Sequence, residues 1–206
     1  MLTGENISFS REGLPLFTDL SFALKESERL TIRGPNGSGK STLLRLLAGL
    51  IPSQTGSFFW KGQLISRSDL KLYEQNLLYI GHKLGLHPQA HVKDQLQLWQ
   101  RLYQIPLENI ERALHFWGVH TFRHKKISHL SQGQQKRLSL SRCHWLKRPL
   151  WILDEPEAGL DQEGKRLLLN ALAHHIESGG SIVHATHEGD EVINTLRIEA
   201  LERGKR

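Results

Sequence analysis

The chain has 206 residues, of which 38% are hydrophobic and 23% are charged, an ordinary balance for a domain with a substantial core. It contains no apolar run of about 18 residues, so we expect no membrane-spanning helix. Its first residues lack the basic and apolar segments of a secretory signal, so we do not expect secretion. The single cysteine, Cys143, excludes an internal disulfide. The formal net charge of +6 permits contact with anionic lipid or nucleic acid, although a nucleotide site and an ordinary solvated surface account for it as well.

Two segments near the N-terminus alternate in hydrophobicity as strands do. Residues 20–24 favour an antiparallel strand, and residues 29–33 predict a second strand that ends at a glycine-rich loop. Residues 42–48 have the composition of a helix. A strand, a glycine-rich loop and a helix in this order form the setting in which a phosphate-binding loop works.

The glycine-rich segment fits the phosphate-loop pattern G-x-x-x-x-G-K-[ST]. Glycines let the backbone approach phosphate closely, and the N-terminus of the following helix favours an anion. Lys40 would reach the β and γ phosphates, and the hydroxyl of Ser41 would bind Mg²⁺. The predicted nucleotide-binding residues of this loop are Gly34, Pro35, Asn36, Gly37, Ser38, Gly39, Lys40, Ser41 and Thr42.

The rest of the chain alternates between helical and strand patterns. Residues 82–130 are rich in His, Gln and Trp and have helical spacing, which predicts a helical insertion at about 84–130. Residues 150–153 and 181–186 predict buried strands, and residues 164–178 predict a helix that stops at two glycines. Strands that alternate with helices indicate an α/β fold with a mostly parallel sheet. We expect one domain over residues 1–206.

Two carboxylates, Asp154 and Glu155, directly follow the predicted strand at 150–153. In a phosphate-loop protein, an acid at this position supports Mg²⁺, directly or through water, and this role falls to Asp154. Glu155 would then lie beside the γ-phosphate and polarise the attacking water as a general base.

The segment at residues 130–137 resembles the L-S-G-G-Q signature of ABC ATPases, with Gln132 in place of the first glycine. A helix is expected from about 134 to 146, with its N-terminus facing an anion. The resemblance implies that this anion is the γ-phosphate held by a second copy of the chain, in a head-to-tail dimer that buries two ATP molecules. The signature residues would be Ser131, Gln132, Gly133 and Gln134.

The resemblance to ABC ATPases covers the whole chain. It implies a P-loop fold with a mostly parallel core sheet, an N-terminal antiparallel β subdomain and a helical subdomain. Asp161 matches the D-loop aspartate at the subunit contact, and His187 matches the switch histidine that contacts the γ-phosphate. The implied cofactors are ATP and Mg²⁺.

Two positions depart from the usual family pattern. Arg11 stands where the family has an aromatic residue that stacks on adenine, a contact that a guanidinium plane can also make. Phe9 is the alternative, although we expect it to point into the core. His82 stands where the family has a glutamine that senses Mg²⁺ and the attacking water, so we count His82 among the catalytic residues.

The segments at 79–82, 130–137 and 149–156 resemble one branch, the haem-exporter ATPases of cytochrome c maturation, although residues 157–161 depart from the run common in that branch. This implies two copies on the cytoplasmic face of the bacterial inner membrane. They would bind polytopic membrane subunits and drive haem export or release of haem from its chaperone, and no nucleic acid is expected. Candidate docking residues for those subunits are Leu84, Leu86, Leu96 and Trp99.

Three alternatives stay open. The same ATPase could serve another exported cargo, or it could act in solution on nucleic acid or ribosomes. The histidines could also bind haem or a metal directly, although their spacing favours ordinary surface positions. The candidate clusters are His82/His87/His91, His115/His120/His124 and His174/His175.

Overall fold

The computed structural model describes residues 2–186 and 195–197, and the chain divides into two compact units. The first, which we call the sheet unit, comprises residues 1–79, 148–155 and 175–206. The second, the helical unit, comprises residues 80–147 and 156–174. The helical unit includes the predicted insertion at 84–130, and the expectation of one domain over the whole chain stays a prediction.

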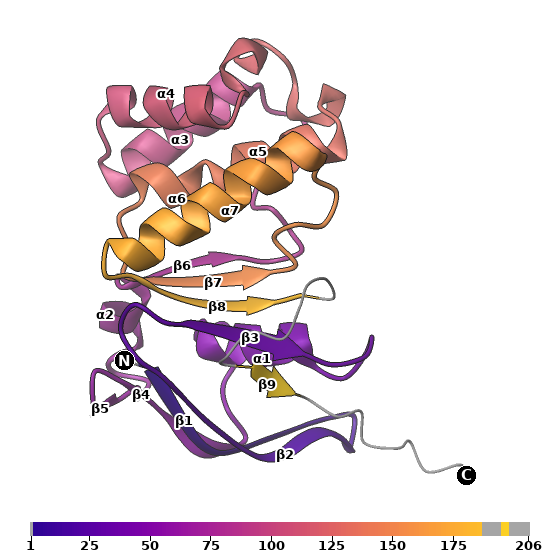
Figure 1. Cartoon of the computed structure of the whole chain (residues 1–206), viewed down its shortest axis with the longest axis vertical. Coiled ribbons are helices and arrows are strands. Elements are labelled where there is room, and N and C mark those ends of the chain that lie inside the picture. Colours follow the sequence, from indigo (N-terminus) through magenta and orange to yellow (C-terminus); the bar gives the residue numbers. More distant parts are fainter. Residues whose placement is uncertain (1, 187–194, 198–206) are drawn as a thin grey trace. The chain divides into compact units, whose positions relative to one another are not determined.

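An antiparallel sheet begins the sheet unit (Figure 1). Its first two strands form a hairpin, in which Glu12 and Gly13 have φ angles of 53° and 78°. Two successive positive φ angles are typical of the type I′ turns that match the twist of paired strands. In spatial order the strands are β2 (Leu14–Leu24), β1 (Leu2–Arg11), β4 (Thr55–Trp60) and β5 (Gln63–Leu64).

A second sheet has β7 and β8 at its interior, and every residue of these two strands is buried, as in a parallel sheet covered on both faces. Strand β8 pairs in parallel with β7 and with β3, so the carboxyl ends of all three lie at one edge. In spatial order the strands are β6 (Leu77–Ile80), β7 (Leu150–Asp154), β8 (Ser181–Ala185), β3 (Arg29–Arg33) and β9 (Thr195–Arg197).

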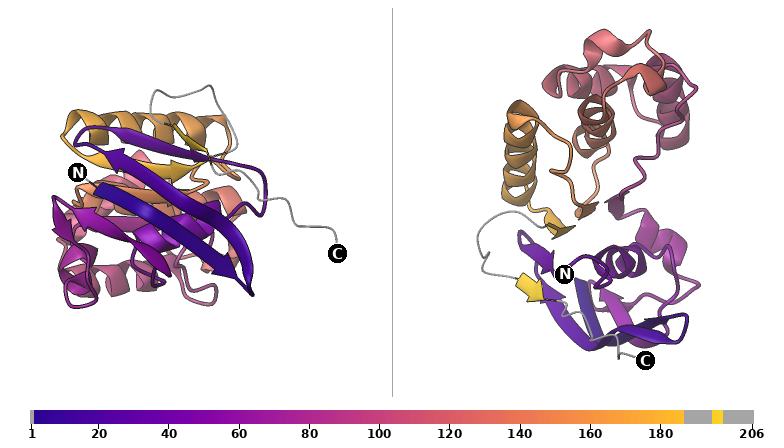
Figure 2. Two further views of the ribbon diagram at one scale, coloured as in Figure 1. Left: turned by 90° about the horizontal axis from the view of Figure 1, so that it is seen from below. Right: turned by 90° about the vertical axis from the view of Figure 1, so that its right-hand side faces the viewer.

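Helix α1 (Lys40–Leu47) lies over the antiparallel sheet in the right-hand view of Figure 2, and the short α2 (Leu70–Glu74) follows β5 in the chain. One face of α1 is apolar: Leu43, Leu44 and Leu47 are buried in a core shared with both sheets. This packing holds the first turn of α1 at the edge where β3 ends.

The helical unit is built around tryptophans. The rings of Trp99 and Trp145 lie 5.6 Å apart, and Trp117 is fully buried. Its elements are α3 (Val92–Tyr103), α4 (Leu107–Phe116), η1 (His120–Phe122), η2 (Ile127–His129), α5 (Gln132–Leu140), α6 (Arg142–Trp145) and most of α7 (Gln162–Glu177).

The predicted elements around the motifs are confirmed within two residues at each end, with one exception. The helix expected from about 134 to 146 begins at Gln132 and ends at Trp145, within that margin, but it is wrong as one continuous helix because it is interrupted at Ser141. It begins early because Ser131 caps it. It breaks because the hydroxyl of Ser141 donates to the carbonyl of Leu138 at 2.7 Å, a back-bond that competes with the regular helix.

Candidate functional site

The loop between β3 and α1 is held open by two glycines in the left-handed region, Gly37 at φ 81° and Gly39 at φ 101°. Gly39 is also crowded by β2. A Cβ atom there would lie 3.1 Å from the ring of Phe17 and 3.3 Å from the Cβ of Leu16. The loop therefore needs glycine at residue 39 for two independent reasons, its backbone angle and its close packing.

The ammonium group of Lys40 lies inside this loop. It donates to the carbonyl oxygens of Gly34 at 2.8 Å and of Pro35 at 3.1 Å, and the side chain is buried. Burial lowers the pKa of Lys40, whereas the negative charges of Glu155 and Asp154 act in the opposite direction. A cation enclosed by a turn of backbone, next to two acids, is the arrangement that a phosphate group with a divalent ion would complete.

Ser41 and Asp154 meet at the edge of the parallel sheet. The hydroxyl of Ser41 donates to Oδ1 of Asp154 at 3.2 Å. Asp154 is only 3% exposed, and its other oxygen, Oδ2, is buried without a hydrogen-bond partner among the described residues. A buried carboxylate oxygen without a partner is costly unless a cation satisfies it. A hydroxyl and a carboxylate are oxygen ligands of the kind that Mg²⁺ prefers, so these residues fit that ion.

Glu155, the predicted general base, has a left-handed backbone with φ 46°. A non-glycine residue pays about 1–3 kcal/mol for such a conformation and retains it only when its surroundings enforce it. Here the N–H of Glu155 donates to the carbonyl of Ala185 on β8 at 3.1 Å, which ties the residue to the sheet edge. The strained turn places a half-buried carboxylate directly after Asp154.

The two candidates for adenine contact lie on β1. Arg11 is exposed at the end of the strand, where its guanidinium lies 3.8 Å from the carboxylate of Glu12. Phe9 packs against the core, and its ring is stacked with that of Phe17 at a centroid distance of 6.3 Å. Phe9 is therefore part of the packing, as expected, whereas the role of Arg11 stays a prediction.

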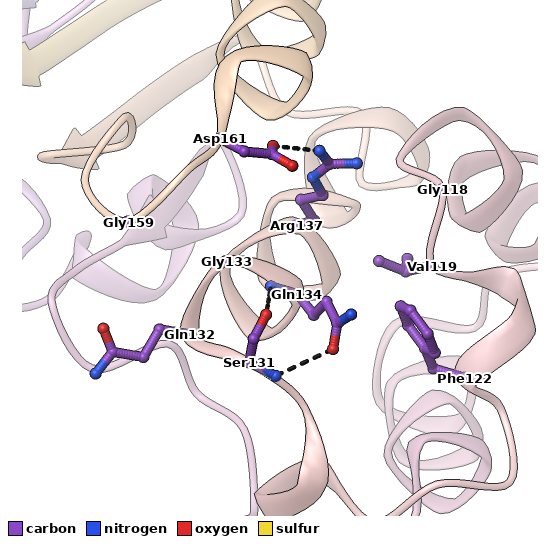
Figure 3. Close-up of a pocket in the computed structure, with 10 residues that line it drawn as sticks. All are labelled: Gly118, Val119, Phe122, Ser131, Gln132, Gly133, Gln134, Arg137, Gly159 and Asp161. Carbon is purple, nitrogen blue, oxygen red and sulfur yellow. Dashed lines mark hydrogen bonds and ion pairs between the residues drawn. The ribbon is translucent and has the colours of Figure 1, made fainter.

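In the helical unit, Ser131 and Gln134 close the first turn of α5 on each other (Figure 3). The N–H of Gln134 donates to Oγ of Ser131 at 3.2 Å, and the N–H of Ser131 donates to Oε1 of Gln134 at 3.0 Å. This is a capping box, which fixes the helix N-terminus and leaves the N–H groups between the two residues for other acceptors.

The signature segment also packs tightly against the D-loop. A Cβ atom on Gly133 would lie 2.8 Å from the carbonyl oxygen of Gly159, so only glycine allows this approach. The two segments border a cavity of about 530 Å³. In Figure 3, the side chain of Gln132 points away from Phe122, another residue that lines the cavity. The cavity is lined by Gly118, Val119, Phe122, Ser131, Gln132, Gly133, Gln134, Arg137, Gly159 and Asp161.

The carboxylate of Asp161 is already engaged within its own chain. It forms an ion pair with Arg137 (Figure 3). It also accepts from the N–H of Gly164 at 2.8 Å, which makes it the N-cap of α7. The hydrogen bond from Arg137, and then that from Gly164, lower the pKa of Asp161. Arg137 ends the signature segment at 130–137, six residues after Ser131, and its partner follows only from the fold.

The remaining predicted sites are His82, His187 and the docking residues. His82 belongs to the helical unit, where it is exposed, and its catalytic role stays a prediction. His187 lies outside the described residues. The prediction that Leu96 and Trp99 are docking residues is wrong, because both are buried in the helical unit, with 1% and 4% of their surface exposed. Their helical spacing marked the packed face of α3.

No sequence pattern singles out a further residue, Arg142. It is 9% exposed, and its guanidinium donates to the carbonyl of Leu84 at 3.0 Å and to Oγ of Ser139 at 2.7 Å. Ser139 donates to the same carbonyl of Leu84 at 2.9 Å. The segment that follows His82 is thus fixed to the helices that follow the signature.

The histidine clusters do not assemble as metal ligands. Across residues 2–186 and 195–197, no three His, Cys, Asp or Glu side chains gather closely enough to bind a metal ion. The rings of His115 and His120 stack at 3.9 Å, and His144 accepts a hydrogen bond from Trp117, both of which are packing contacts. In the same part of the chain, no helix combines the length and apolarity needed to cross a bilayer.

Comparisons with known proteins agree with this geometry. The family model described as "ABC transporter" matches residues 17–158. The protein named cytochrome c biogenesis ATP-binding export protein CcmA of Cupriavidus pinatubonensis is 37% identical, over 98% of this chain and 91% of its own length. Its namesake from a Chelativorans species is 38% identical, over 90% of this chain and 91% of its own length.

Solved structures support the same fold. A dimeric ATP-binding cassette in a post-hydrolysis state, with ADP and Pi bound, superposes with a TM-score of 0.82 at 20% identity, over 98% of this chain and 97% of that one. A putative ABC transporter ATP-binding protein from Pyrococcus furiosus gives 0.79 at 20% identity, over 96% of both chains. The fold is therefore the P-loop ATPase fold expected from the sequence.

Proposed function

Since this chain belongs to the ABC transporter family, as a CcmA-like ATP-binding and ATP-hydrolysing subunit, we propose that it powers a membrane complex for cytochrome c biogenesis. The observation that carries this assignment is the similarity to proteins of that name along nearly the whole chain. The work done is export of haem or its release from a chaperone.

The ATP site is the loop at residues 34–42. In our proposal, Lys40 leaves the carbonyls of Gly34 and Pro35 and binds the β and γ phosphates, because a phosphate oxygen is a stronger acceptor for an ammonium group than a carbonyl. Arg11 stacks on the adenine. The residues 1–206 act as one ATPase domain.

Mg²⁺ would be held by Ser41 and Asp154, whose buried Oδ2 offers an unused acceptor. When bound, this ion neutralises charge that develops on the phosphates. Glu155 accepts a proton from water as the water oxygen attacks the γ-phosphorus, and the bond from phosphorus to the bridging oxygen of ADP breaks. His82 and His187 assist by orienting the water and the γ-phosphate.

Two copies of the chain would complete each ATP site. The N-terminus of α5, formed by Ser131, Gln132, Gly133 and Gln134, approaches the γ-phosphate bound to the second copy. The dimeric state of a neighbouring solved structure supports this arrangement. Asp161, held by Arg137, lies beside that surface at the subunit contact. The dimer would sit on the cytoplasmic face of the inner membrane, bound to polytopic subunits.

The test is a Glu155→Gln variant, tagged and expressed in its own cells. Without the base, ATP binds but hydrolysis slows, so the closed dimer accumulates with its partners. Membranes are solubilised with Mg-ATP and the co-purifying proteins identified. Polytopic membrane subunits with a haem-binding protein are the expected result.

The matched control is Lys40→Ala, which removes phosphate binding and should recover far less of the same partners. Recovery of ribosomes or nucleic acid would overturn the proposal. Membrane subunits that serve another cargo would reject the cytochrome c assignment while leaving the ATPase assignment intact.

A further inference from the structure

The two units of the chain differ in charge. The helical unit contains 13 Lys and Arg against 6 Asp and Glu, a formal charge of +7. The sheet unit contains 14 Lys and Arg against 15 Asp and Glu, a formal charge of −1. The net charge of +6 therefore comes from the helical unit, whereas the predicted phosphate loop belongs to the other one. A nucleotide site in the sheet unit does not explain this asymmetry.

Part of this charge is concentrated in one local feature, which we call the basic turn: residues 123–126 together with Lys93. The sequence Arg123-His124-Lys125-Lys126 joins η1 to η2. The N–H of Lys93 donates to the carbonyl of Arg123 at 2.9 Å, and the N–H of Val92 donates to that of Lys125 at 3.0 Å. These bonds place Lys93, at the start of α3, next to the turn.

The three lysines of the basic turn are available to a partner. Lys93, Lys125 and Lys126 are exposed, and none forms an ion pair with a carboxylate of the described residues. The nearby acids have their own partners: Glu111 pairs with Arg123, and Asp94 lies 3.4 Å from the ring of His91. The ammonium of Lys125 also lies over the ring of Phe122, 5.0 Å from its centroid, a contact that leaves it without an acidic partner. Exposed cations without a carboxylate partner attract an extended anionic partner.

We propose that the basic turn binds anionic phospholipid headgroups at a membrane surface. The inference rests on the proposed function, which brings this chain to a membrane. Lysine ammonium groups are compact point charges without the planar fork with which arginine recognises one carboxylate or phosphate in a fixed geometry. Three lysines therefore suit a diffuse layer of lipid phosphates, to which each contributes additively.

The test measures binding of the purified full chain to two kinds of vesicle, phosphatidylcholine alone and phosphatidylcholine with phosphatidylglycerol, by co-sedimentation over a range of salt concentrations. We expect binding only to the anionic vesicles, weakening as salt screens the charges. The variant Lys93→Gln/Lys125→Gln/Lys126→Gln should bind them roughly 100-fold more weakly, since each lysine near the surface contributes a few-fold.

The control variant Lys25→Gln/Arg67→Gln/Lys71→Gln removes the same charge from exposed positions of the sheet unit and should bind like the unaltered chain. Equal loss in both triple variants would overturn the proposal, because net charge alone would then govern binding. So would preference of the basic turn for duplex DNA over anionic vesicles. ATPase activity, measured in parallel, should be unchanged in both variants, so a failure here is distinct from a failure of the proposed function.

Discussion

Ser41 and Asp154 are 113 positions apart in sequence, yet the hydroxyl of one donates to Oδ1 of the other at 3.2 Å. The contact arises because β3 and β7 both pair in parallel with β8, which brings the ends of both strands to one edge. The second oxygen of Asp154 stays buried without a partner in the described part of the chain. The pair therefore combines a fixed geometry with an unsatisfied negative group.

The variant Asp154→Asn should separate metal binding from folding. The amide keeps the shape but removes the charge, so the Mg²⁺ concentration needed for ATP binding should rise at least about tenfold. Without Mg²⁺, the free energy of unfolding should stay the same or rise by about 1 kcal/mol, because a poorly satisfied buried charge is gone. Nucleotide fluorescence titrations with Mg²⁺ and urea unfolding measure the two effects. The control Glu74→Gln, an exposed carboxylate on α2, should change neither, and an unaltered Mg²⁺ requirement in Asp154→Asn would reject the assignment.

Gly39→Ala should damage the phosphate loop more than its backbone angle alone predicts. The new methyl group would stand 3.1 Å from Phe17, so the loop must shift as well as adopt a strained φ. Gly62 supplies the matched control: its φ is 80°, but a Cβ there meets nothing within 4 Å. We expect Gly62→Ala to cost about 1 kcal/mol and to leave ATP affinity intact. Gly39→Ala should lower that affinity at least about tenfold, since a displacement of even 1 Å spoils phosphate contacts. Equal ATP affinities in the two variants would show that the crowding has no effect.

The elements that carry the nucleotide chemistry were predictable because they are local. The phosphate loop, the strand before Asp154 and the position of Ser131 each follow from a run of fewer than ten residues, whose pattern directly sets the backbone. The parallel pairing in the core sheet was predictable from the rule that strands alternating with helices pair in parallel, whereas the order of its strands was not predicted.

Relationships between distant residues were not predictable. Helical spacing places the apolar residues Leu96 and Trp99 on one face of a helix. Periodicity alone cannot tell whether that face packs in the core or docks a partner. The ion pair of Asp161 was not predictable either, because its partner Arg137 lies on α5, 24 positions earlier. Ser141 broke a helix through a hydroxyl back-bond that propensity does not foresee. In each case tertiary context decided the outcome.

Arg142→Lys should destabilise the protein although it preserves the charge. The guanidinium packs over the ring of Trp99 at 5.5 Å and divides its donors between Leu84 and Ser139, which an ammonium group cannot reproduce. Leaving a buried carbonyl with fewer partners should lower the free energy of unfolding by about 2–3 kcal/mol. Urea denaturation measures it. The exposed Arg112→Lys is the control, for which we expect a change within about 0.5 kcal/mol. Similar values for both variants would mean that the buried contacts of Arg142 contribute little.

His184 should make stability fall in acid. The side chain is buried on β8, with Nε2 at 2.9 Å from Oγ1 of Thr31, and burial, assisted by Arg29 and Arg33, lowers its pKa to about 4 from the ordinary 6.5. Between these two values the unfolded chain binds a proton that the folded chain does not. With respect to this group, the free energy of unfolding is therefore highest above pH 6.5. It falls as the pH drops toward 4, by up to about 1.4 kcal/mol per pH unit.

Urea unfolding of His184→Gln at several pH values between 6.5 and 4 tests this expectation, because its stability should fall less steeply than that of the unaltered chain. Thr31→Val serves as the companion variant: it removes the hydrogen bond but leaves the imidazole buried. If burial is the main cause of the shift, Thr31→Val lowers stability at every pH and retains the steep dependence. A slope that disappears in Thr31→Val would assign the shift to the hydrogen bond. A slope that persists in His184→Gln would assign it to other groups.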